Sequence, residues 1–397
     1  MDNFSHSLVG LAVGELVQRS LAPEPQSAQQ QTRRRMLLVA CGAASNVPDL
    51  DLLLKSLLPD PLGYLLLHRG HTHTLLFAVP QGVLLATLLW LLWPAARRLL
   101  AASAAARRGL ALAITLGLLL HLAMDFLNSY GIHPFYPIDP HWLFGDMVFI
   151  VEPVFWIATG VPLALMVRSR PMRWSLLALL AGVPLWSAYT GFLHAGSLAL
   201  LATVALIAGM LQLRAPGNGR AGLLAGLATC LAFVGMQAIA SARGVATLAA
   251  QLHQRAPASE LVDASMTAYP ANPLCWNFVA VERNEAAGVY RLRRGVLSVA
   301  PAVLAVDHCP AGLAGAIDRR AASPAIAILS NDAANLSALR RLARDNCYFR
   351  DWLRFARTPL VRGDVASDVR FGTPLAPNFS TIDLAQFTGR ACPLNVP

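Results

Sequence analysis

Charged residues are scarce in this chain. They make up 14% of its 397 residues, whereas 55% are hydrophobic. A soluble domain usually carries about a quarter charged residues. This deficit excludes a disordered chain and argues against an ordinary cytosolic enzyme. Several apolar runs reach about 20 residues, which is long enough to cross a bilayer. The composition therefore predicts an integral membrane protein.

Apolar stretches alternate with short polar loops up to residue 241. This pattern predicts a mostly α-helical, polytopic membrane bundle of about seven or eight spans. The expected spans are 4–18, 36–54, 73–93, 109–127, 148–167, 174–190, 197–213 and 221–241. The first is short and carries Glu15, so whether residues 4–18 cross the bilayer stays open. No later run reaches span length, which predicts a membrane domain, 1–241, and a soluble domain, 242–397.

Arginine is distributed unevenly among the predicted loops. The intervening loops hold two basic residues, Lys55 and Arg69, and the alternate loops hold all the others before residue 221. Those others are Arg19, Arg33, Arg34, Arg35, Arg97, Arg98, Arg107, Arg108, Arg168, Arg170, Arg173, Arg214 and Arg220. Because basic loops stay in the cytoplasm, the soluble domain is expected outside it, on a bacterial inner membrane. This topology also accounts for the net charge of +10, so we expect no nucleic acid partner.

The soluble domain is expected to be α+β. Residues 276–283 and 288–299 suit a β-hairpin, and 332–356 carries apolar residues at helical spacing. Four of the six cysteines fall in this part of the chain, a number that suits two disulfides in an oxidising compartment. They are Cys275, Cys309, Cys347 and Cys392. Their pairing cannot be read from the sequence, and four free buried thiols are the alternative.

Histidine and acidic residues gather where the predicted spans reach the side away from the arginine loops. Ionisable groups at membrane depth are costly and by default mark a functional site. The group comprises His6, Asp49, Asp51, the segment 68–74 with its three histidines, His121, Asp125, and His133, Asp139, His141, Asp146 and Glu152 of the next loop. This clustering is independent of the arginine count, yet both point to one face.

The residue types and their spacing predict a metal site. His121 and Asp125 are four residues apart on one helix face, where they can offer nitrogen and oxygen to the same ion. His68 and His73 flank a short turn, and imidazole is the commonest transition-metal ligand. As a simpler alternative, the segment 68–74 could anchor the chain at the membrane interface.

Asp49 and Asp51 do not share a helix face, but a break at Pro48 would let both turn toward a common centre. Asp-x-Asp alone is a weak signal, because it often caps or ends a helix. Mixed histidine and carboxylate ligands suit zinc, manganese or iron better than calcium. Arg69 is a candidate for binding an anionic substrate group.

Four motifs follow one another along the first third of the chain. They are His6, Pro48-Asp49-Leu50-Asp51, His68-Arg69-x-x-Thr72-His73-Thr74 and His121-x-x-x-Asp125-x-x-x-x-x-Gly131. In this combination they resemble the YdjM-like family of membrane-bound, metal-dependent hydrolases, over roughly residues 1–160. The tail, with Trp276, Trp352 and Phe371, is similar to that of longer members.

The resemblance implies a multi-pass hydrolase that uses a divalent metal, and it leaves the substrate undefined. Carried over position by position, the metal ligands would be His6, Asp49, Asp51, His68, His73, His121 and Asp125. Asp146 and Glu152 match a less distinctive region; they would support the ligands or act as a general base. The catalytic set would then be Asp49, Arg69, Asp146 and Glu152.

The leading hypothesis is hydrolysis at the outer leaflet. A site at headgroup level would meet membrane lipid, so a phospholipid or a lipid-linked phosphoester is the expected substrate, attacked by metal-activated water. A metal transporter or an envelope assembly scaffold is the alternative. Transport needs ionisable residues along a path, and the cytoplasmic halves of spans three to eight have almost none. The metal, the number of ions, the bond cleaved and the oligomeric state stay open.

Overall fold

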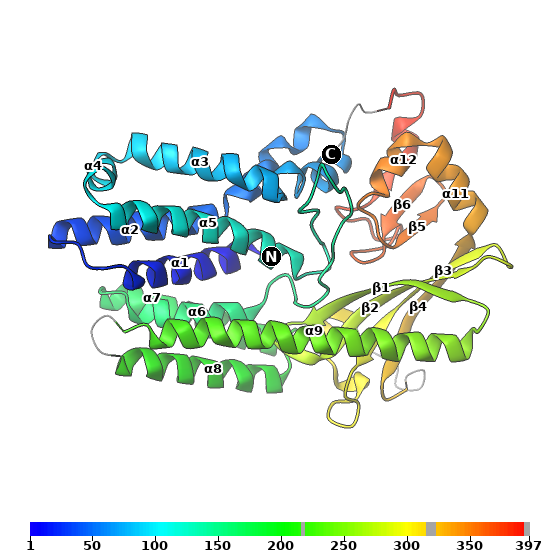
Figure 1. Ribbon diagram of the computed structural model, residues 1–397. Coiled ribbons are helices and arrows are strands. Elements are labelled where there is room, and N and C mark those ends of the chain that lie inside the picture. Colours follow the sequence, from blue (N-terminus) through cyan, green and yellow to red (C-terminus); the bar gives the residue numbers. More distant parts are fainter. Residues whose placement is uncertain (216–218, 315–322, 393–397) are drawn as a thin grey trace.

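The computed structural model describes residues 1–215, 219–314 and 323–392. Long helices lie side by side in a bundle, and a part rich in β-strands adjoins one end of it (Figure 1). The long helices are α1 (Asn3–Ser20), α2 (Ser27–Ala44), α3 (Leu75–Leu92), α5 (Ala104–Phe126), α6 (Pro153–Leu165), α7 (Arg170–Tyr189), α8 (Ala195–Arg214) and α9 (Ala221–Arg255). A short helix, α4 (Pro94–Ala102), joins α3 to α5.

The bundle confirms a mostly helical membrane protein, and a helix lies over each of the eight predicted spans. Within the described residues, five segments are long and apolar enough to cross a membrane: Ser27–Leu57, Leu75–Leu92, Ala104–Phe126, Ala195–Arg214 and Ala221–Arg255. α6 is apolar but has only 13 residues. A count of seven or eight spans therefore stays a prediction, as does the side of the membrane on which each end lies.

The second predicted span, 36–54, is not one continuous α-helix. α2 starts earlier, at Ser27, and ends at Ala44. The chain then turns at Asn46 into a 3₁₀ segment, η1 (Val47–Leu57). Pro48 explains the change, because proline has no backbone N–H and cannot continue the hydrogen bonding of α2. The two aspartates of this region therefore lie on η1, the 3₁₀ part of the candidate span Ser27–Leu57, rather than on α2.

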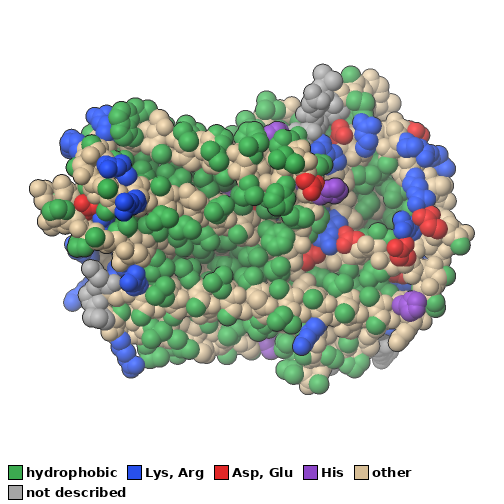
Figure 2. All heavy atoms as spheres, viewed as in Figure 1, with side chains coloured by type: hydrophobic (Ala, Val, Ile, Leu, Met, Phe, Trp, Pro, Cys, Tyr) green, Lys and Arg blue, Asp and Glu red, His purple; other side chains and the backbone are tan. Residues whose placement is uncertain are grey.

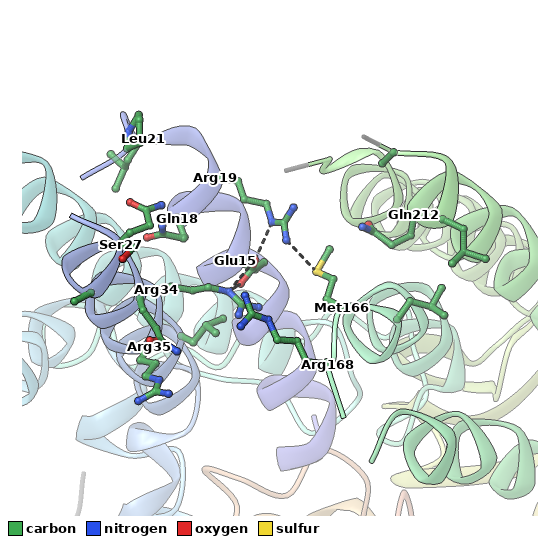
Figure 3. Close-up of a pocket in the computed structure, with 18 residues that line it drawn as sticks. Glu15, Gln18, Arg19, Leu21, Ser27, Arg34, Arg35, Met166, Arg168 and Gln212 are labelled. Carbon is green, nitrogen blue, oxygen red and sulfur yellow. Dashed lines mark hydrogen bonds and ion pairs between the residues drawn. The ribbon is translucent and has the colours of Figure 1, made fainter. Parts of the chain in front are cut away.

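Arginine side chains gather at the end of the bundle away from the strands, while hydrophobic side chains cover its middle (Figure 2). At that end a cavity of about 1070 Å³ opens between α1, α2, α6 and α8. Glu15 is buried there, and its carboxylate lies 2.8 Å from Nε of Arg19 and 2.9 Å from Nε of Arg34 (Figure 3). The acidic residue of the first predicted span is thus paired with arginines of α1 and α2.

α9 joins the bundle to the β-rich part without a break. The change in composition near residue 242 falls inside this helix, which continues to Arg255. Its last turns, with Leu248 and Leu252, pack on Met266 and Trp276 of the sheet in one buried apolar cluster. The two halves of the chain therefore share a structural element, and their division into two separate domains stays a prediction.

The β-rich part contains two antiparallel sheets. The larger has the order β1-β2-β3-β4 and the smaller the order β5-β6-β7. Their strands are β1 (Glu260–Tyr269), β2 (Asn272–Asn284), β3 (Val289–Ser298), β4 (Ile326–Asn335), β5 (Pro359–Arg362), β6 (Val365–Asp368) and β7 (Ile382–Asp383). β2 and β3 form the predicted hairpin, with Gly288 at a positive φ of 63° in the turn. α11 (Leu336–Asp345) and α12 (Cys347–Trp352) occupy the segment where helix was predicted.

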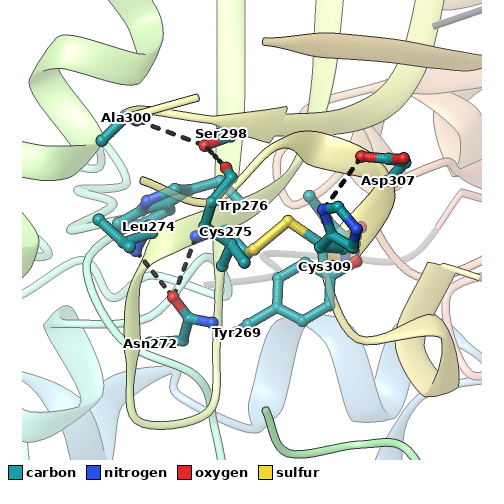
Figure 4. Close-up of a disulfide and its surroundings, with 12 residues drawn as sticks. Tyr269, Asn272, Leu274, Cys275, Trp276, Ser298, Ala300, Asp307 and Cys309 are labelled. Carbon is teal, nitrogen blue, oxygen red and sulfur yellow. Dashed lines mark hydrogen bonds and ion pairs between the residues drawn. A yellow bond between two sulfur atoms is a disulfide. The ribbon is translucent and has the colours of Figure 1, made fainter. Parts of the chain in front are cut away.

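Two disulfides close loops in this part, as the cysteine count predicted. Cys275 of β2 bonds to Cys309, and Cys347 bonds to Cys392. Beside the first bond, the side-chain oxygen of Asn272 accepts hydrogen bonds from the backbone N–H groups of Leu274 and Cys275 (Figure 4). The other two cysteines, in α2 and α9, are free and buried.

We expect the substitution Cys309→Ser to lower the stability of the β-rich part. The bond closes a loop of 34 residues, and releasing such a loop costs roughly 3–4 kcal/mol. Thermal unfolding of the purified protein, with and without reductant, measures the loss. Cys230→Ser, which removes a free thiol and keeps both disulfides, is the control and should respond to reductant as wild type does. Equal effects of reductant on wild type and Cys309→Ser would show that this disulfide does not form.

Candidate metal centre

Four buried side chains from three separate segments meet at the end of the bundle nearest the sheet. Asp49 comes from η1, His73 from the 3₁₀ turn η3 (His71–His73), and His121 and Asp125 from the last turns of α5. One ligand atom from each lies within 4.8 Å of the others. We call these four residues the metal tetrad. Three of them are 0–1% exposed, and Asp49 is 8% exposed.

The distances within the tetrad suit a single transition-metal ion. Nε2 of His73 lies 3.0 Å from Nε2 of His121, 3.3 Å from Oδ1 of Asp49 and 3.2 Å from Oδ2 of Asp125. Nε2 of His121 lies 3.5 and 3.6 Å from the same two oxygens. Metal–ligand bonds of about 2.0–2.2 Å place neighbouring ligands about 2.8–3.6 Å apart, the shorter values in an octahedron and the longer ones in a tetrahedron. These five distances therefore approximate the edges of a metal coordination shell.

The hydrogen bonds on the outer sides of the two rings orient their lone pairs toward the centre. Nδ1 of His121 lies 2.8 Å from the backbone carbonyl oxygen of Ser45, which can only accept a hydrogen bond. Nδ1 of His73 lies 3.2 Å from a carboxylate oxygen of Asp51. Each Nδ1 therefore carries a hydrogen, and each Nε2 is directed inward. Metal-binding histidines show this arrangement, in which an outer acceptor fixes the ring.

The charge around His73 shows how strongly the centre attracts a cation. Burial lowers the pKa of this imidazole, but hydrogen bonds to Asp125, Asp49 and Asp51 outweigh burial and raise the pKa to about 10. Without a cation among the carboxylates, the ring holds a proton at neutral pH. A metal ion would take the place of that proton, because coordination requires the deprotonated nitrogen. The electrostatics of the tetrad thus agree with its geometry.

Asp51 and His68 stand behind the tetrad, although both were predicted as ligands. The two oxygens of Asp51 are used by Nδ1 of His68 at 2.9 Å, the backbone N–H of Arg69 at 3.0 Å, the hydroxyl of Thr72 at 2.5 Å and Nδ1 of His73. Asp51 therefore fixes the ring of His73 instead of reaching the centre. His68 reaches Asp51 and lies at the edge of the cluster, 8% exposed.

His6 and Arg69 surround Asp125, the most enclosed acid of the tetrad. Nε2 of His6 lies 3.2 Å from Oδ1 of Asp125, and its ring stacks on His121 with centroids 4.2 Å apart. Nε of Arg69 lies 3.0 Å from Oδ2 of Asp125, and the amino group of Met1 contacts Oδ1. His6 and Arg69 thus both contact the carboxylate of Asp125. The guanidinium of Arg69 already has partners within the protein, and its expected role in binding an anionic substrate group stays a prediction.

Asp146 and Glu152 make their contacts outside the tetrad. Arg357 Nη1 lies 2.7 Å from Asp146, and the same guanidinium pairs with Asp263 of β1. Glu152 is fully buried and accepts hydrogen bonds from the backbone N–H groups of Val154 and Ala271. Both acids therefore tie the bundle to the β-rich part. Their predicted roles beside the ligands have no support in these contacts.

The sequence did not single out Ser45 or Thr72 as partners of the site. Ser45 acts through its backbone carbonyl, which any residue would offer, so no side-chain signal exists. Thr72 lies inside the His68–Thr74 motif, and its hydroxyl bonds to both Asp51 and Nδ1 of His73. The sequence signal for this role is the position of Thr72, a hydroxyl residue, between His71 and His73.

Comparison with known proteins supports the membrane assignment. A family described as "YdjM inner membrane protein" matches residues 1–195, which confirms the resemblance drawn from the motifs for that part of the chain. The chain is also 26% identical, over 158 residues, to the "Uncharacterized protein YfhP" of Bacillus subtilis (strain 168). That alignment spans 40% of this chain and 44% of the relative, less than half of either. No solved structure matches the chain.

We expect Asp51→Asn to weaken metal binding about 10- to 100-fold without abolishing it. An amide still bonds to His73 but does not carry the charge that holds its ring, and losses of this size are usual for such supporting residues. His121→Ala removes a ligand and should abolish stoichiometric binding. Titration of the metal-free protein with Zn²⁺ and Mn²⁺ measures both. His141→Ala, on an exposed loop, is the matched control. Equal affinities in Asp51→Asn and wild type would contradict this assignment.

Proposed function

We propose that this chain, whose N-terminal half matches the YdjM family, is a metal-dependent hydrolase of the membrane that cleaves a phospholipid or a lipid-linked phosphoester. The observation that carries the proposal is the metal tetrad, Asp49, His73, His121 and Asp125, buried at one end of an apolar helical bundle. Carboxylates and imidazoles in this position are costly for a membrane protein, and a bound ion would offset that cost.

The donor set is compatible with several divalent ions. Two nitrogens and two oxygens suit Zn²⁺, Mn²⁺ or Fe²⁺. Zinc held by four protein groups in a tetrahedron would have no open position, whereas an octahedral ion would keep two. Manganese or iron is therefore favoured for catalysis at this site. When bound, such an ion supplies a hydroxide-like water near neutral pH and neutralises charge on the reacting phosphate.

His68 is the residue of this chain best placed to move a proton. Its Nδ1 bonds to Asp51 at 2.9 Å, so its Nε2 is free to accept a proton from water. Like Asp49, it is 8% exposed, whereas the remaining tetrad residues are almost fully enclosed. Water and substrate would approach from this side. As the water oxygen bonds to phosphorus, His68 takes its proton, the P–O ester bond breaks, and the protonated His68 returns the proton to the leaving alkoxide oxygen.

The position of the tetrad supports a lipid substrate. η1 and η3 lie where α2 ends and α3 begins, so the site is level with the ends of apolar helices. η1 and the start of α3 also carry exposed apolar side chains, including Leu53, Leu57 and Leu76. In a membrane, headgroup phosphates lie where the apolar part of a spanning helix ends. Binding a water-soluble substrate would not require exposed apolar side chains.

A structural ion is the second candidate, because four protein donors can close a tetrahedral zinc site completely. In that case the protein would be a membrane scaffold and the ion would only hold η1, η3 and α5 together. Metal analysis alone does not separate the two functions, because both require the same ligands. A catalytic assay does separate them.

The test is hydrolysis of phosphatidylglycerol in mixed micelles by the purified full chain. We expect activity that EDTA removes and that Mn²⁺ or Fe²⁺ restores. His73→Ala should lose both metal and activity, because the ring is a ligand. His68→Ala should keep its metal but lose about 10²- to 10⁴-fold in kcat, the range for removal of an acid–base group.

His141→Ala again serves as the control and should keep full activity. A chain that binds stoichiometric metal but hydrolyses no lipid phosphoester would support the scaffold. A metal-free wild-type protein would overturn the proposal. Unchanged kcat in His68→Ala would remove that residue from the reaction while leaving the metal site in place.

A further inference from the structure

A second feature of interest is a cavity between the helical bundle and the larger sheet. It has a volume of about 400 Å³, within the range of small-ligand sites, which often lie between two parts of a protein. Its walls come from Tyr64, the segments 128–130 and 148–150, the strands β1, β2 and β3, and the segment 370–379. Aromatic rings form much of the lining: Tyr64, Tyr130, Phe149, Phe278, Phe371 and Phe379.

Three buried residues that line this cavity have polar atoms without a partner among the described residues. They are Nδ2 of Asn128, the hydroxyl of Tyr130 and the hydroxyl of Ser265, on side chains that are only 2–4% exposed. The orientation of Asn128 is set by its other atom, because Oδ1 accepts from the backbone N–H of Tyr130 at 2.8 Å. An unsatisfied buried polar group costs about 1–3 kcal/mol. A polar occupant that reached these atoms, water or a ligand, would remove that cost.

The charge of the lining favours an anion. Two arginines and no acidic residue occur among the described residues that line the cavity. The guanidinium of Arg370 is engaged with Asp368 at 2.7 Å and with the carbonyl oxygen of Ser129 at 2.6 Å. Arg294 of β3 is half-buried and has no ion-pair partner within the described part of the chain. Arg294 is therefore the cation available to an occupant.

The cavity shares a wall with the metal centre. Oδ1 of Asn128 lies 3.4 Å from Nη1 of Arg69, whose Nε contacts Asp125 of the tetrad. The guanidinium of Arg69 also lies 4.4 Å from the ring centre of Tyr130. The ring of His68 lies 5.2 Å from that of Tyr64 and 6.0 Å from that of Tyr130. An occupant of the cavity would thus lie beside the residue assigned to proton transfer.

We propose that this cavity binds the phosphate-bearing polar headgroup of the lipid substrate. Arg294 pairs with the phosphate, while Asn128, Tyr130 and Ser265 bond to its oxygens and to headgroup hydroxyls. The inference rests on the proposed hydrolase function, and it gives the β-rich part a role in that function. The sheet completes the substrate site that the bundle alone would leave open.

The probe is sn-glycerol 3-phosphate, titrated calorimetrically into the full chain in detergent with its metal in place. Wild type should bind it more tightly than inorganic phosphate, because the headgroup hydroxyls gain partners. Arg294→Gln should weaken binding at least tenfold, as expected when a charge-assisted hydrogen bond is lost. Ser265→Ala should weaken binding severalfold without lowering thermal stability, since its hydroxyl has no hydrogen-bond partner among the described residues.

Arg291→Gln is the matched control, because it removes the same charge from β3 but does not line the cavity, and it should bind like wild type. Equal binding by Arg294→Gln and wild type, or no binding to wild type, would overturn the inference. Inorganic phosphate binding as tightly as glycerol phosphate would overturn the headgroup assignment. Metal content is measured on the same samples. A metal-free wild type that still binds glycerol phosphate through Arg294 would overturn the hydrolase and leave the headgroup site standing.

Discussion

The metal tetrad gathers carboxylates and imidazoles where water is excluded, and the surrounding structure must offset the free-energy cost of burying them. Asp49 and Asp125 face the same two histidine nitrogens, and a third acid, Asp51, lies directly behind one ring. Like charges so close together repel strongly in a medium of low polarity, so the arrangement requires positive charge at its centre and around it. Arg69 supplies part of that charge, and its backbone takes a left-handed conformation, φ 61°, to do so. The turns of η1 and η3 bring these groups together.

Local rules were enough to predict much of this arrangement. His121 and Asp125 follow from helical periodicity alone, because residues four apart share a face. Asp49 and His73 stood out because charged and histidine side chains are rare at membrane depth, so their position was informative without any knowledge of the fold. The hairpin of β2 and β3 and the presence of two disulfides followed in the same way from alternation and from cysteine count. Each of these signals lies within a short stretch of chain.

What the sequence could not predict depends on angles and on distant partners. The 3₁₀ geometry of η1, which contains Pro48, decides which of Asp49 and Asp51 reaches the centre of the tetrad. The sequence places Glu152 near the membrane face and so predicts it as part of the site, but its partner is the backbone of Ala271, 119 residues away. The cavity beside Tyr130 was invisible for the same reason, since its walls come from segments far apart in the chain.

The continuity of α9 has a mechanical consequence. At 1.5 Å per residue, its 35 residues form a rod of roughly 50 Å. Its first turns pack against α6 and α8, and its last turns carry the sheet. The helix is continuous from Ala221 to Arg255, so a change in its tilt would carry the sheet packed on its last turns. If α9 crosses a bilayer, as its length and composition allow, the orientation of the sheet follows from the tilt of this one helix.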